Sequence, residues 1–132
     1  MNENELIGLL ESLRRMGSDD LSVEVKESAT TLSRDVWETV SAFANTAGGI
    51  IVLGVSERAG FVPVEDFETE KVLNQFVAGM GDAGGRGKLA NPPKYIIERV
   101  ELRGTVVLVI TIEELDPSSK PCYVIERGAQ GG

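Results

Sequence analysis

The stretch FANTAGGIIVLGVSE, residues 43–57, constrains the fold more than any other part of the chain. It begins as the end of a helix, passes through Gly48 and Gly49, and continues as an apolar strand that contains Gly54. A phosphate-binding loop needs the opposite order, strand then glycines then helix, so that helix N–H groups face the anion. The order seen here therefore favours packing: a left-handed helix end at Gly48, a tight strand entry at Gly49, and a close approach at Gly54.

Hydrophobic periodicity along the rest of the chain predicts an α+β fold, a single domain with a mixed central sheet and about three helices. Helical spacing occurs in residues 5–16, 33–45 and 68–78, and strand-like runs occupy 22–28, 49–55, 94–102, 105–114 and 122–126. The run 49–55 is almost wholly apolar, which is typical of a central strand covered on both faces. We expect the strand of Val23 to lie beside that of Ile50, and a core that includes Val36, Val40, Phe43, Ile50, Val52, Leu53, Val107 and Val109.

The absence of certain residue types excludes several chemistries. The chain has no histidine, which removes Ser-His-Asp and Cys-His catalysis and any zinc site that uses imidazole. Its single cysteine, Cys122, excludes an internal disulfide framework. No apolar run reaches the length of a membrane span, and the N-terminus lacks a basic signal region, so we expect a cytoplasmic location and no membrane partner. The last residues, RGAQGG, indicate a piece of a longer protein.

The charge distribution limits the partners of such a domain. Net charge is −8, with 14 acidic and 5 basic residues in 1–70 and 7 acidic and 8 basic residues in 71–132. Affinity for nucleic acid comes largely from neutralised phosphates, so that function must rest on a local basic patch. The glycine-rich segment 79–90 predicts a flexible, unpacked loop that could clamp phosphates. The expected nucleic-acid-binding residues are Lys26, Arg86, Lys88 and Lys94.

Carboxylates on two expected strands raise a second possibility. Glu24 lies on the strand of Val23, and Glu57 follows the apolar strand, with Asp19 or Asp20 near the first. Neighbouring strands would bring these groups together as hard ligands for magnesium or manganese, a site able to drive phosphodiester cleavage. The residue pattern favours a charged sheet edge in which Lys26 pairs with Glu24, and leaves the metal site as the alternative.

Two blocks, VEVKES at 23–28 and VSAFANTAGGIIVLGVSERAGF at 40–61, resemble the AlbA-type domain of the Schlafen superfamily. This domain also stands at the N-terminus of bacterial helicase-related transcriptional regulators known as divergent AAA proteins. The family pattern is a Glu-x-Lys strand, a helix ending in Ala-Phe-Ala-Asn-Thr-x-Gly-Gly, and an apolar strand closing in Gly-Val-x-(Asp/Glu). The resemblance covers roughly residues 18–128, so we divide the chain into an N-terminal helix, 1–17, and the AlbA-like domain, 18–132. Its structural motif falls on Asn45, Thr46, Gly48, Gly49 and Gly54.

The resemblance implies a nucleic-acid-related role. In bacterial relatives the domain is taken as a DNA-binding module, whereas in some animal relatives paired lobes form a metal-dependent RNA nuclease. The three acidic residues of that nuclease would fall on Asp19, Glu24 and Glu57 here, with magnesium or manganese as cofactor. This chain has one such lobe, so we predict a DNA-binding module of a bacterial transcriptional regulator, with no cofactor and no catalysis of its own. A nuclease and a protein-interaction or homodimerisation module are the alternatives.

Overall fold

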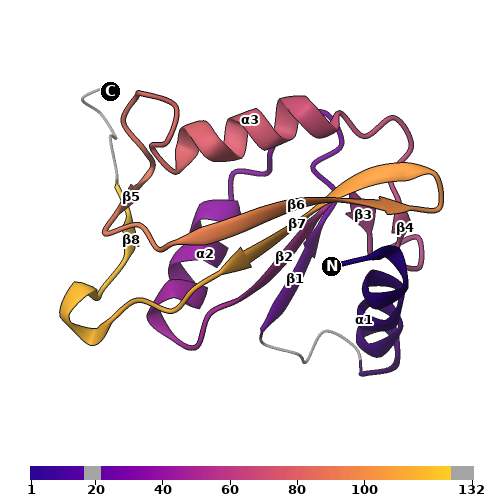
Figure 1. Cartoon of the computed structure of the whole chain (residues 1–132), viewed down its shortest axis with the longest axis horizontal. Coiled ribbons are helices and arrows are strands. Elements are labelled where there is room, and N and C mark those ends of the chain that lie inside the picture. Colours follow the sequence, from indigo (N-terminus) through magenta and orange to yellow (C-terminus); the bar gives the residue numbers. More distant parts are fainter. Residues whose placement is uncertain (17–21, 126–132) are drawn as a thin grey trace.

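The computed structural model describes residues 1–16 and 22–125, and a four-stranded sheet forms its centre (Figure 1). The strand order is β1 (Val23–Lys26), β2 (Gly49–Leu53), β7 (Thr105–Ile112) and β6 (Tyr95–Leu102). β1 runs parallel to β2, and the other two pairings are antiparallel. The register places Val23 opposite Ile50, which confirms the predicted pairing of these two strands.

Helices pack on both faces of the sheet. α2 (Val36–Asn45) and α3 (Thr69–Gly79) lie on one face, and α1 (Glu3–Met16) lies on the other (Figure 1). Successive side chains of a strand point to opposite faces, so Ile51 packs under α2 and α3 while Val52 packs under α1. Both faces of β2 are therefore covered, which explains its continuous apolar sequence and confirms the predicted α+β fold.

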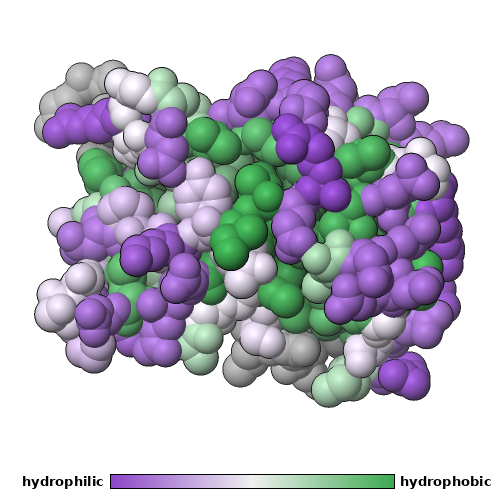
Figure 2. Space-filling model, viewed as in Figure 1, coloured by the Kyte–Doolittle hydropathy of each residue, from purple (hydrophilic) through white to green (hydrophobic). Residues whose placement is uncertain are grey.

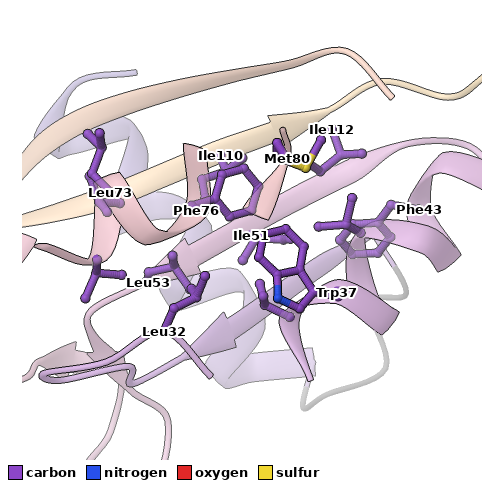
Figure 3. Close-up of a cluster of buried hydrophobic side chains, with 14 of the residues drawn as sticks. Leu32, Trp37, Phe43, Ile51, Leu53, Leu73, Phe76, Met80, Ile110 and Ile112 are labelled. Atoms are coloured by element: carbon purple, nitrogen blue, oxygen red, sulfur yellow. The ribbon is translucent and has the colours of Figure 1, made fainter. Parts of the chain in front are cut away.

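The larger core lies between the sheet and helices α2 and α3, where aromatic rings stack (Figure 3). Trp37 and Phe76 have ring centroids 5.4 Å apart, and Tyr95 forms a T-shaped contact with Phe76 with ring centroids 5.3 Å apart. The predicted core is confirmed, with Ile50 partly buried and seven residues buried: Val36, Val40, Phe43, Val52, Leu53, Val107 and Val109. Trp37, which is 8% exposed, was not among the predicted core residues.

Two short sheets flank the central one. β3 (Val55–Ser56) pairs with β4 (Val62–Pro63), and β5 (Leu89–Ala90) pairs with β8 (Tyr123–Val124), which follows the 3-10 turn η2 (Pro117–Ser119). β5 lies at the end of the segment predicted to be a flexible, unpacked loop, and Leu89 is 6% exposed. The prediction is wrong there, because pairing with β8 fixes the backbone and buries the leucine.

The sheet face that carries α1 is not wholly covered. Figure 2 shows apolar side chains gathered beside α1, over β6, and Ile96 on this strand is 60% exposed. Polar residues surround this small apolar area (Figure 2).

None of the helices in the described parts of the chain has the length and apolar character needed to cross a bilayer.

Candidate nucleic-acid interface

An open groove lies between the segment that leads into α2, the C-terminal half of α3, and the end of β8. Among the described residues, its lining includes three exposed cations, Arg34 before α2 and Arg86 and Lys88 after α3, and no carboxylate. Within the described residues none of these cations forms an ion pair. We call this the basic groove. Its cations remain available to an anionic ligand.

The loop that carries Arg86 and Lys88 is anchored to the domain at several points. The backbone N–H of Lys88 donates to the carbonyl of Gly79 at 2.6 Å, and the carbonyl of Lys88 accepts from Ile125 N–H at 2.9 Å. The Tyr95 hydroxyl donates to the carboxylate of Asp82 at 2.9 Å. Burial, followed by this hydrogen bond, raises the pKa of Tyr95 to about 12. The backbone of Lys88 and the Asp82 end of the loop are therefore held by the rest of the domain.

Trp37 forms part of the groove floor. A Cβ atom added at Gly79 would lie 2.0 Å from Cζ2 of Trp37, so α3 can lie against the indole only with glycine at this position. No described residue accepts a hydrogen bond from the indole Nε1, yet no fully buried polar side-chain atom lacks a partner. The Nε1–H of Trp37 therefore keeps some contact with solvent, and the residue lines the groove.

Gln75 is fixed beside this floor. Its Oε1 accepts the backbone N–H of Leu32 at 2.7 Å, which ties α3 to the segment before α2. The amide nitrogen of Gln75 has no partner among the described residues, and the side chain lines the basic groove. The floor thus offers two neutral donors, from Gln75 and Trp37, below the three cations.

Two of the four basic residues predicted to bind nucleic acid lie outside the groove. The Lys26 side chain is 9% exposed and forms ion pairs with Asp35 at 3.1 Å and Glu24 at 3.8 Å. Lys94 lines a separate surface together with Glu113 and other carboxylates. The fold therefore brings Arg86 and Lys88 together and separates Lys26 and Lys94 from them.

Two residues of the predicted acidic trio, Glu24 and Glu57, lie in the described part of the chain. Glu24 lies opposite Ile51 in the register of β1 and β2, and Glu57 comes after β3. The Ser56 hydroxyl donates to Glu27 at 2.8 Å, so Glu27, not Glu24, lies beside the segment that carries Glu57. Asp19 lies outside the described residues. Among the residues described, no group of three or more Asp, Glu, His or Cys side chains could hold a metal ion.

Sequence reasoning missed three residues of the basic groove: Arg34, Trp37 and Gln75. Arg34 stands next to Asp35 in the sequence, which hides its charge in any local sum. Trp37 borders the apolar stripe of α2. It is the only tryptophan of the chain, and this is the one local signal that could have indicated a functional role. Chain order does not link these residues to the 86–88 segment, because tertiary packing alone brings them together.

The motif Asn45–Gly54 is held by hydrogen bonds of its polar residues and by close packing at its glycines. The side-chain amide of Asn45 donates to the carbonyl of Cys122 at 2.8 Å and accepts its N–H at 2.7 Å, which fixes the chain just before β8. The Thr46 hydroxyl donates to the carbonyl of Ala42 at 2.8 Å. Three glycines lie where a Cβ atom would come within 2.7 Å of a neighbour: Gly48 (φ +76°) at the Ile112 carbonyl, Gly49 at the Phe43 ring, and Gly54 (φ +97°) at the Phe67 ring.

The fold and this groove define a small α+β domain with a local cationic site. The family model for the Schlafen AlbA_2 domain matches residues 19–128, and the chain belongs to this family. This result confirms the resemblance seen in the sequence.

Two solved structures align with most of the chain. The N-terminal domain of a DNA helicase RecG-related protein from Nitrosomonas europaea is 27% identical, with a TM-score of 0.71 over 95% of this chain and 83% of that one. The DIP2311 protein from Corynebacterium diphtheriae is 16% identical, with a TM-score of 0.40 over 94% of this chain and 27% of that one. No curated protein matches the chain.

Proposed function

We propose that this domain is a nucleic-acid-binding module, with DNA as its ligand, that serves a bacterial transcriptional regulator and does no catalysis itself. The observation that carries the proposal is the basic groove, whose lining includes Arg34, Arg86 and Lys88 and, among the described residues, no carboxylate, in a chain of net charge −8. Membership of the Schlafen AlbA_2 family and the likeness to a domain of a DNA helicase RecG-related protein support a nucleic-acid-related role.

The arrangement of the three cations suits a phosphodiester backbone. The guanidinium groups of Arg34 and Arg86 can each donate two parallel hydrogen bonds to a phosphate, and Lys88 adds a compact charge. Backbone hydrogen bonds hold Lys88, so little conformational entropy is lost when its segment meets a ligand. Three such contacts are few, which predicts weak affinity that does not depend on base sequence.

The dependence of affinity on salt tests this proposal. Each phosphate contact contributes about −0.9 to the slope of log K against log salt on duplex DNA, so three contacts predict a slope of about −2.7. Replacing both Arg86 and Lys88 with alanine should weaken binding and bring the slope to about −0.9. Fluorescence anisotropy of a labelled duplex, measured at several salt concentrations, gives both quantities.

A control variant separates the groove from the net charge. The double change Lys71→Ala and Lys94→Ala also removes two positive charges, but from residues outside the groove lining. The salt slope of this variant should stay near that of the unchanged protein. Equal effects of the two double variants would mean that only overall charge matters. An unchanged slope after loss of Arg86 and Lys88 would move the protein-interaction alternative ahead.

A further inference from the structure

The floor of the basic groove differs from its rim. We call the three cations the rim and the other lining residues the floor. Apart from Thr31, Gln75 and Gly79, the floor is apolar and consists of Leu32, Trp37, Ala78, Val124 and Ile125. A site that bound only phosphates would need the rim and would gain nothing from an apolar floor. The floor therefore points to a flat, apolar group attached to the phosphates.

The two neutral donors on this floor narrow the chemistry further. The Nε1–H of Trp37 and the amide nitrogen of Gln75 have no partners among the described residues, although Trp37 is only 8% exposed. Such donors are best satisfied by hydrogen-bond acceptors on the bound group. A nucleobase has an apolar face and carries acceptors on its edge, whereas an aliphatic chain offers no acceptor.

We propose that the basic groove binds an unpaired base of a single strand, with the neighbouring phosphates on Arg34, Arg86 and Lys88. This inference rests on the proposed nucleic-acid-binding function and specifies the state of the ligand. In a duplex the bases are stacked and paired, so a duplex could reach the rim cations but would leave the floor empty. A single strand can turn a base into the groove and use both regions, as proteins that bind single strands combine basic grooves with aromatic side chains.

The only tryptophan reports directly on the proposed contact. We expect a single-stranded oligothymidylate to quench the fluorescence of Trp37 and to bind about tenfold or more tightly than a duplex of equal length. An abasic oligonucleotide of that length keeps the phosphates and lacks the bases. It should bind about as weakly as the duplex and leave the fluorescence unchanged. An oligouridylate arm shows whether the source of the strand is RNA or DNA.

A change on the floor gives a second test that spares the core. Ala78 is an exposed residue of α3, and Ala78→Leu places bulk in the groove without altering Trp37 or any cation. This variant should lose the tenfold preference for the single strand and keep the salt slope, whereas the matched variant Ala78→Ser should retain the preference. Circular dichroism checks that both variants stay folded.

The possible outcomes separate the two proposals. Equal binding of the abasic and thymidylate strands, or an Ala78→Leu variant that keeps its preference, would overturn the base-binding groove and leave phosphate binding intact. Failure of every oligonucleotide to bind would instead overturn the proposed function itself.

Discussion

At the scale of single residues, two glycines in helices predict opposite effects of the same substitution. Gly8 in α1 has no atom within 4 Å of an added Cβ, so Gly8→Ala should stabilise the protein by about 0.5–1 kcal/mol through helix propensity. Gly79 in α3 lies against Trp37, so Gly79→Ala should destabilise it by about 1–3 kcal/mol through overpacking and displace the indole. Urea unfolding followed by tryptophan fluorescence measures both. Stabilisation by both variants would mean that Trp37 does not lie under α3.

The same residues show what local sequence can and cannot predict. The packing expected at Gly48 and Gly54 follows from the order helix, glycines, strand, which is a local feature of the sequence. The requirement for Gly79 is invisible in the sequence, because it arises from contact with Trp37, 42 positions earlier. Lys26 was predicted to pair with Glu24, and it does, but its closer partner Asp35 comes from the start of α2.

At the scale of elements, α1 lies outside the region matched by the family model and still completes the core. Leu6 is fully buried against the sheet, whereas Met16 in the same helix is 59% exposed. Leu6→Ala should lower the free energy of unfolding by about 2–5 kcal/mol, because it leaves a cavity between α1 and the sheet. Met16→Ala, the control, should change it by less than about 0.5 kcal/mol. If chemical denaturation gave similar values for both, α1 would not be an integral part of the domain.

Elements with strong local patterns were predictable, and elements made by pairing were not. The turn between β6 and β7 was expected at Arg103 and Gly104, and both have positive φ, +49° and +88°, as a tight hairpin requires. β5 has two residues and no pattern of its own, and it exists because β8 lies beside it. The sequence therefore predicts the loop that carries Arg86 and Lys88 without the backbone hydrogen bonds that hold Lys88. It also does not predict that Val124 and Ile125, at the end of β8, line the groove.

At the scale of the whole molecule, net charge opposes the proposed ligand. The chain carries −8, and its acidic excess lies in the first seventy residues. Coulomb repulsion of a polyanion acts over the Debye length, which is about 30 Å at 0.01 M salt and about 8 Å at 0.15 M. Carboxylates remote from the groove should therefore weaken binding at low salt, whereas the groove cations act at contact and retain their effect at physiological salt.

Neutralising three remote carboxylates tests this separation of long-range and contact electrostatics. Glu11, Glu65 and Glu101 are exposed and form no ion pair within the described residues, and their change to glutamine brings the net charge from −8 to −5. At about 0.01 M salt the affinity for a single strand should rise several-fold, and at about 0.15 M the variant and the unchanged protein should bind equally. Anisotropy titrations at both concentrations measure the two affinities. A gain that persisted at 0.15 M would place these carboxylates within the contact surface and contradict a ligand confined to the basic groove.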